Sequence, residues 1–254
     1  MPRFAANLTM LFREHPMLER FAAARQAGFK AVEILFPYDV PGRAIRNALE
    51  ANDLELALIN TPPPNWGAGD RGFGAIAGGE EQFQHDFRRA IRYSSVLKPR
   101  HIHIMAGVAK GPEAHDCFVR NLIWATAEAP DQSLTIEPIN PIDLPGYFLN
   151  DFDQAAAILD EVGAANLNLQ FDVYHAQRIT GDAIHTWDQH GHRAVHIQVA
   201  RAEGRHEPDA SGAINYPTFF ERLDRGGYDG WVSAEYIPEG QTKDGLDWAQ
   251  LTPS

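Results

Sequence analysis

The sequence predicts a single (β/α)8 barrel that takes up the whole chain, residues 1–254. The length fits, because a single barrel of this kind typically has about 250 residues. Short apolar runs rich in β-branched residues alternate with longer stretches of helical period, which is the pattern of βα units around a parallel sheet. Eight such runs are present. This number favours a closed barrel, since an open doubly wound sheet usually has about five or six strands.

The expected elements follow one another along the chain. Strands are expected at 3–8, 31–35, 54–60, 101–106, 133–137, 167–172, 195–199 and 231–236. A helix is expected after each strand, at 15–27, 41–51, 80–97, 113–129, 151–162, 178–190, 215–225 and 241–251. The longest irregular segment, 61–79, is dense in Gly and Pro and follows the third strand. Long loops of this kind are usually either functional lids or disordered segments, and we expect a lid over the catalytic face.

Composition excludes several classes of partner. A formal net charge of -12 argues against nucleic acid or an anionic membrane, since either partner requires a basic face. No apolar run approaches the roughly 18 residues of a membrane span. The start of the chain lacks the features of a signal or transit peptide, so a cytoplasmic location is expected. The single cysteine, Cys117, excludes an internal disulfide. The sequence leaves open whether the chain forms a homo-oligomer.

Four consecutive strand ends each carry one oxygen-bearing side chain. The ends read LTIEP, LQFDVYH, VHIQV and VSAEY, and they supply Glu137, Asp172, Gln198 and Glu235. Active sites of this fold gather where the strands end. An isolated carboxylate at such a place often caps the next helix or pairs with an Arg. Three carboxylates and an amide that converge on one point suit a hard divalent ion such as Mg²⁺ or Mn²⁺.

Three further residues are candidates for substrate binding. His175 lies three residues beyond Asp172, where the sixth strand is expected to give way to its loop, although a capping role is the alternative. Arg205 and His206 follow the seventh strand and are the candidates for holding a substrate carboxylate, because a guanidinium offers a planar bidentate fork. The alternative is that both are solvated loop charges. His101 and His103 are interpreted as core or supporting groups.

The chain resembles the hydroxypyruvate isomerase family, which includes 2-oxo-tetronate isomerases and falls within the xylose-isomerase-like TIM barrel superfamily. The resemblance spans nearly the whole length. It rests on FAANLTMLF, GDRGFGAIAG, IEPIN with DLPGYFLN, LNLQFDVYHAQ, HIQVA with GRHEP and INYP, and WVSAEY. It implies that Glu137 and Glu235 are the paired catalytic glutamates and that Glu137, Asp172, Gln198 and Glu235 hold one divalent metal ion. In related sugar epimerases the ligand on the seventh strand is His, so Gln198 points away from them.

We therefore expect a metal-dependent isomerase that acts on a small anionic 2-oxo hydroxy acid. It would convert hydroxypyruvate to tartronate semialdehyde, or act on a 2-oxo-tetronate, by proton transfer through an enediolate. The sequence does not decide which glutamate acts first, and a hydride shift stays open. A ketose or sugar 3-epimerase is the alternative. An endonuclease IV-type metal nuclease is disfavoured, because it requires more His ligands and a basic surface.

Overall fold

Eight parallel strands close into a barrel in the computed structural model, and each strand pairs with its neighbours in chain order. The structure describes residues 2–63, 65, 67, 69–209 and 211–250. The pairing of β1 with β8 closes the barrel. The expected fold class is confirmed. The strands are β1 (Arg3–Asn7), β2 (Ala31–Glu33), β3 (Glu55–Asn60), β4 (His101–His103), β5 (Ser133–Ile136), β6 (Leu167–Asp172), β7 (Ala194–Val199) and β8 (Trp231–Ala234).

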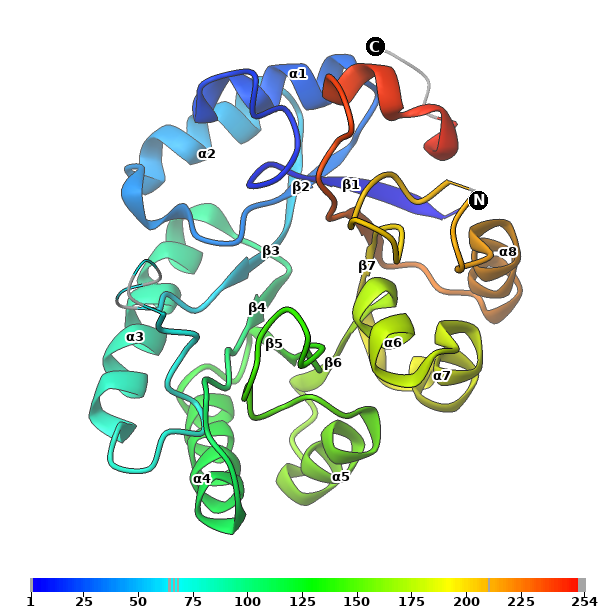
Figure 1. The fold of residues 1–254 in the computed structure, drawn as a ribbon. Helices are drawn as coiled ribbons and strands as arrows, with labels where there is room; N and C mark the ends of the chain where they lie inside the picture. Colours follow the sequence, from blue (N-terminus) through cyan, green and yellow to red (C-terminus); the bar gives the residue numbers. More distant parts are fainter. Residues whose placement is uncertain (1, 64, 66, 68, 210, 251–254) are drawn as a thin grey trace.

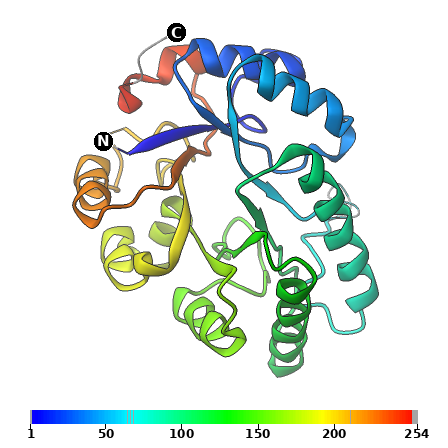
Figure 2. The same cartoon turned by 180° about the vertical axis from the view of Figure 1, so that it is seen from behind.

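The α-helices form an outer ring around the strands (Figures 1 and 2). They are α1 (Arg20–Gln26), α2 (Gly42–Ala51), α3 (Glu80–Leu97), α4 (Pro112–Glu128), α5 (Phe152–Val162), α6 (Val173–Thr180), α7 (Ala183–His190) and α8 (Tyr216–Gly226). Short 3-10 helices supplement them: η1 (Met17–Glu19), η2 (Pro37–Asp39), η4 (Gly191–Arg193), η5 (Thr242–Gly245) and η6 (Asp247–Ala249). Within the described part of the chain, no helix has the length and apolar character needed to cross a membrane.

The expected helix at 178–190 was wrong in its start and its continuity. α6 begins directly after β6, because the Asp172 side chain accepts hydrogen bonds from the backbone N–H groups of Tyr174 and His175 and so caps the helix. Gly181, with a φ of 80°, ends α6 in the left-handed conformation, and α7 starts two residues later. His175 therefore lies in the first turn of a helix and not in a loop.

The expected last helix, 241–251, was also wrong. The described residues of this segment form two short 3-10 helices, η5 and η6, with Gly245 at the end of η5. Glycine in a helix interior costs about 1 kcal/mol relative to alanine. In addition, the buried Thr242 hydroxyl accepts a hydrogen bond from the Phe12 backbone N–H at 2.7 Å, which ties the segment to the loop after β1.

Alternate residues of each strand face either the helices or the barrel axis. On β6, Phe171 faces outward and packs against Phe152 of α5 and Trp187 of α7, with ring centroids 5.0 and 5.2 Å apart. Gln170 and Asp172 face the axis, where their hydrogen bonds join neighbouring strands. The barrel axis is therefore lined by polar groups at the end where the strands finish.

The opposite end of the barrel axis is closed by an apolar cluster. Ala5, Ala31 and Ala57 are buried against the indole of Trp231, the first residue of β8. Small side chains on three neighbouring strands leave the space that this large ring fills. The indole N–H of Trp231 donates to Glu55 Oε1 at 2.8 Å. This cluster separates the polar interior from the face where the strands begin.

Candidate active site

The four side chains expected to bind a metal are all buried around the end of the barrel where the strands finish. Glu137 follows β5, Asp172 ends β6, Gln198 lies in β7 and Glu235 follows β8. Glu137, Gln198 and Glu235 line a cavity of about 370 Å³, together with His175 and Arg205. The strand register places Asp172 directly beside Gln198. The fold thus brings these six side chains to one place.

Two bridging groups connect the four side chains in pairs. The Gln170 amide donates to Glu137 Oε2 at 3.0 Å and to Gln198 Oε1 at 2.8 Å. The Arg205 guanidinium lies 2.9 Å from Glu235 Oε1 and 3.5 Å from Asp172 Oδ2. The Gln170 amide and the Arg205 guanidinium therefore lie between the side-chain oxygen atoms that would coordinate an ion.

The three carboxylates are held in an environment that disfavours their charge. Burial raises the pKa of Glu137 well above its usual value, and the neighbouring Asp172 and Glu235 raise it further. Burial also raises the pKa of Asp172 to about 6, although Arg205 opposes the shift. The pKa of Glu235 is raised well above its usual value by burial, again against the effect of Arg205. One guanidinium does not compensate three carboxylates.

Arg205 is held over the cavity by its own loop. Its backbone has a φ of 55°, and its guanidinium carbon lies 4.9 Å from the centre of the Tyr174 ring. Burial lowers the pKa of the guanidinium, but Glu235 and Asp172 outweigh burial and raise it, so the group stays charged. A fixed cation therefore faces the cavity, as an anionic substrate requires.

His175 presents a proton to the carboxylates. Its Nδ1 accepts a hydrogen bond from the Asn140 backbone N–H at 3.3 Å, so in the neutral ring the proton is on Nε2. Nε2 lies 3.5 Å from Asp172 Oδ2 and 3.8 Å from Glu137 Oε1. Burial and then Arg205 lower the pKa of His175, which keeps the ring neutral. Glu137, Asp172 and His175 also lie close enough together to share an ion, but a protonated Nε2 is not a ligand.

His206 has different surroundings from Arg205. Its Nδ1 lies 2.8 Å from the carbonyl oxygen of Ile237, and its ring neighbours Glu207 and Glu239. It is not among the described residues that line the 370 Å³ cavity. Its expected role in substrate binding stays a prediction, without the geometric support that Arg205 has.

The sequence reasoning missed several residues of the barrel interior. Glu33 of β2 is fully buried and contacts the amide of Gln198. Gln170 joins Glu137 and Gln198, as described above. His103, which the sequence indicated as a core or supporting group, lines the cavity with Nδ1 3.5 Å from Glu137 Oε2, and burial lowers its pKa to about 3. The signal for Glu33 was visible, because a carboxylate in the apolar run AVEILF is the same pattern that indicated Glu137.

Part of the expected lid is hydrogen-bonded to the segment after β4, and Arg71 beside it lines the cavity. The backbone N–H groups of Gly74 and Ala75 donate to the carbonyl oxygens of Met105 and Ala106 at 3.2 and 2.7 Å. Gly72, with a φ of 100°, approaches so closely that an added Cβ would lie 2.4 Å from the Met105 carbonyl oxygen. Positions 64, 66 and 68 of this segment lie outside the described residues. Movement of the segment as a lid stays a prediction.

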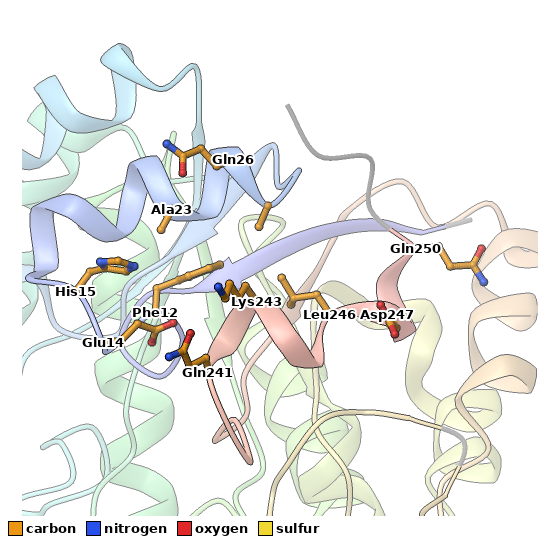
Figure 3. Close-up of a pocket in the computed structure, with 11 residues that line it drawn as sticks. Phe12, Glu14, His15, Ala23, Gln26, Gln241, Lys243, Leu246, Asp247 and Gln250 are labelled. Carbon is orange, nitrogen blue, oxygen red and sulfur yellow. The ribbon is translucent and has the colours of Figure 1, made fainter.

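A larger hollow lies away from these groups. It has a volume of about 710 Å³ and is formed by the segment after β1, by α1 and by the residues around η5 and η6 (Figure 3). Phe12, Glu14, His15 and Lys243 lie along it. None of the four strand-end side chains is among its described lining residues. The smaller cavity, and not this hollow, therefore carries the chemistry expected from the sequence.

Several known proteins are similar to this chain. The model of the xylose isomerase-like TIM barrel family matches residues 21–251. The chain is 46% identical to the 2-oxo-tetronate isomerase of Cupriavidus necator, over 98% of this chain and 97% of that protein. It is 40% identical to the hydroxypyruvate isomerase of Escherichia coli, over 98% of both. A crystal structure described as an AP endonuclease, family 2, from Brucella melitensis has a TM-score of 0.95 and 40% identity, over 98% of both chains.

Proposed function

The chain belongs to the xylose isomerase-like TIM barrel family and is an isomerase, and from that premise we propose that it acts on a small 2-oxo hydroxy acid. The reaction exchanges the carbonyl and hydroxyl groups of neighbouring carbons, as between hydroxypyruvate and tartronate semialdehyde, or in a 2-oxo-tetronate. The observation that carries the proposal is the buried group of Glu137, Asp172 and Glu235, which faces the fixed cation of Arg205.

The donor set fits a divalent metal ion. The lowered pKa values of His103 and His175 leave Arg205 as the cation that contacts this acidic group in the described structure. Glu235 Oε2 is buried without a hydrogen-bond partner among the described residues. A buried oxygen without a partner is costly, and a cation would compensate it. We propose Mg²⁺ or Mn²⁺, because carboxylate and amide oxygens are the ligands these hard ions prefer. Its ligands would be Glu137, Asp172, Gln198 and Glu235.

The ion, when bound, supplies a Lewis acid that stabilises negative charge on the substrate oxygens. Arg205 binds the substrate carboxylate, and His206 stays a second candidate for that contact. His175 donates a hydrogen bond from Nε2 to a substrate oxygen, since this proton already faces the carboxylates. A cavity of about 370 Å³ is near the lower end of the usual range for ligand sites, which suits a three- or four-carbon acid.

Glu137 and Glu235 move the proton. One glutamate removes the proton from the carbon that bears the hydroxyl group, which gives an enediolate. The other starts protonated and gives its proton to the neighbouring carbon, while the hydroxyl proton passes to the former carbonyl oxygen. Proton exchange of both glutamates with water then restores the starting state, so that the atoms balance. The two glutamates directly follow β5 and β8, which lets them approach a substrate from different sides.

The test is turnover of hydroxypyruvate and of 2-oxo-tetronate by the purified protein in deuterated water. We expect one of them to be isomerised, with solvent deuterium at the new C–H bond. Exhaustive chelation should abolish activity, and Mg²⁺ or Mn²⁺ should restore it. Full activity after chelation would contradict the metal site. Complete retention of the original hydrogen would assign a hydride shift, and the glutamates would then serve only as ligands.

Two other activities of related barrels serve as controls for this proposal. A ketose 3-epimerase would turn over uncharged sugars, and Arg205 would then have no carboxylate to bind. The Brucella melitensis structure bears the name of an endonuclease, so cleavage of DNA with abasic sites is the second control. We expect no cleavage, because the chain has a net charge of -12 and its deepest acidic groups surround a small cavity.

A further inference from the structure

Glu33 lies at the centre of a buried hydrogen-bond network beside the proposed metal site. It is fully buried at the end of β2. Its Oε1 accepts from Asn7 Nδ2 at 2.5 Å and from Gln198 Nε2 at 2.8 Å. Its Oε2 lies 2.6 Å from Nε2 of His196. Three polar groups from β1 and β7 therefore converge on one carboxylate.

The direction of these hydrogen bonds is set by the backbone. The N–H of Thr9 donates to Asn7 Oδ1 at 2.9 Å, and a backbone N–H can only donate. Asn7 therefore presents its NH2 group to Glu33 Oε1, which must accept. The same oxygen then accepts from Gln198, so Gln198 turns its own NH2 group toward Glu33.

The opposite end of the network gives the same orientation. Gln170 Oε1 accepts from the Thr135 hydroxyl at 3.0 Å, and its NH2 group donates to Glu137 and to Gln198 Oε1. The contacts with Glu33 and with Gln170 therefore give the same orientation: the Gln198 NH2 group faces β2, and its oxygen faces the side of the barrel where Glu137 lies. The amide is fixed in one of its two orientations.

We propose that Glu33 is the positioning residue that keeps Gln198 Oε1 directed at the metal site. A carboxamide binds a hard cation only through oxygen, because its NH2 group offers two hydrogens and no free lone pair. A flipped Gln198 would turn those hydrogens toward the ion and leave its oxygen against the Glu33 carboxylate. The inference rests on the proposed function in one respect, the use of Gln198 as a ligand.

Two substitutions separate the acceptor role of Glu33 from its charge. Glu33→Gln removes the charge but keeps one oxygen that can accept from Asn7 and Gln198, and His196 can change its tautomer to match. Glu33→Met removes both the charge and the acceptor. We expect Glu33→Met to bind Mn²⁺ about 10- to 100-fold more weakly than Glu33→Gln in calorimetric titration, as for other residues that orient metal ligands. Equal affinities of the two variants would overturn the proposal.

The same two substitutions in a Gln198→Glu variant test whether the difference in Mn²⁺ affinity depends on the amide of Gln198. In Gln198→Glu both oxygens of the side chain are equivalent, so no orientation has to be selected. The difference between Glu33→Met and Glu33→Gln should then shrink to within about twofold. An undiminished difference would mean that residue 33 acts on the fold or on another ligand, which contradicts the proposal.

An exchange measurement on the metal-free protein separates this proposal from the proposed function. By NMR, the side-chain NH2 protons of Gln198 should exchange slowly with water in the wild type and faster in Glu33→Met. A wild-type protein that binds no Mn²⁺ but protects this amide would contradict the metal site alone. An unprotected Gln198 amide in the wild type would overturn the positioning role, and this result does not require that Glu33→Met folds.

Discussion

Glu33 and Glu235 are both buried glutamates at the end of the barrel, but they lie in halves of it that use polar groups differently. Glu33, on β2, has both oxygens in contact with donors from Asn7, Gln198 and His196. Glu235, after β8, has one oxygen on Arg205 and one that no donor among the described residues contacts, and burial together with the nearby Glu33 carboxylate raises its pKa. Burial alone therefore does not distinguish the proposed catalytic glutamate from a supporting one. We expect the number of hydrogen-bond donors around the carboxylate to distinguish them.

The same contrast extends to the other strands of each half. On β3 and β4, Asn60 and His103 contact each other at 3.3 Å, so their polar groups are partly used within the protein. After β5 and on β6, Glu137 and Asp172 have raised pKa values and face a cavity or its bridging cation. In the first half of the barrel, polar side chains mainly bond to one another. In the second half, we propose that the carboxylates are available to bind a metal ion and a substrate.

The largest effect that this contrast predicts is on catalysis. Glu235→Gln and Glu137→Gln keep the size of the side chain and one oxygen but remove the base. Each should lower kcat by about 10²–10⁴-fold, the usual contribution of general acid–base catalysis. Because the two glutamates act on one proton path, the kcat of the double variant should be only slightly lower than that of the less active single variant.

Glu33→Gln is the matched control for these variants, because it makes the same chemical change to a glutamate whose oxygens are already bonded. Its effect on kcat should be far smaller than that of Glu235→Gln in the same steady-state assay. A loss as large as that of Glu235→Gln would show that the two halves of the barrel are not functionally distinct.

An intermediate effect is expected at Arg205, the cation of the second half. Arg205→Ala should raise KM for an anionic substrate by about ten- to a hundred-fold, since a hydrogen bond to a charged group is worth about 1.5–3 kcal/mol. KM for an uncharged sugar of similar size should change little. Arg201→Ala is the control, because Arg201 pairs with Asp209 and Glu239 outside the lining of the cavity. Equal effects of Arg205→Ala on both substrates would assign Arg205 to structure.

The smallest effect is on the stability of the metal-free protein. The pKa of Asp172 is raised from 3.8 to about 6 on folding, so between these values the folded state binds more protons than the unfolded state. Stability from this group is present at low pH and is lost as the pH rises through about 6. Asp172→Asn keeps the helix cap but cannot titrate.

Melting temperatures measured with chelator from pH 4 to pH 7 check this expectation. The Tm of the wild type, relative to Asp172→Asn, should fall by a few degrees across this range. Saturating Mn²⁺ should reverse the trend, because the ion favours the charged carboxylates. A relative Tm that rises with pH without metal would mean that Asp172 is already compensated in the metal-free protein.

The sequence was most informative where a polar residue stands within or at the end of an apolar run. A carboxylate or amide at the end of an apolar run is conspicuous, and the barrel brings such ends together, so the sequence predicts that Glu137, Asp172, Gln198 and Glu235 lie close to one another. Glu33 has the same signal but was not predicted, because it lies on β2, apart from the four consecutive strands whose ends share this pattern. The expected strands match the observed ones to within a few residues, since apolar β-branched runs mark them clearly.

Other features depend on contacts that no local pattern encodes. The pairing of Arg205 with Asp172 and Glu235 requires a left-handed backbone in the loop after β7. The split between α6 and α7 follows from Asp172 acting as a cap, which the helical period around 178–190 concealed. The orientation of Gln198 is decided by a backbone N–H two strands away, through Asn7 and Glu33.

The direct junction between β6 and α6 limits how this enzyme can be altered. Barrels of this kind acquire new substrates mainly by exchanging the loops that follow their strands. After β6 no loop exists to exchange, because Asp172 both ends the strand and caps the helix. An insertion there would move a proposed ligand and uncap α6 at once. Laboratory evolution of substrate choice should therefore accumulate changes in the segments after β3 and β7, and leave this corner invariant.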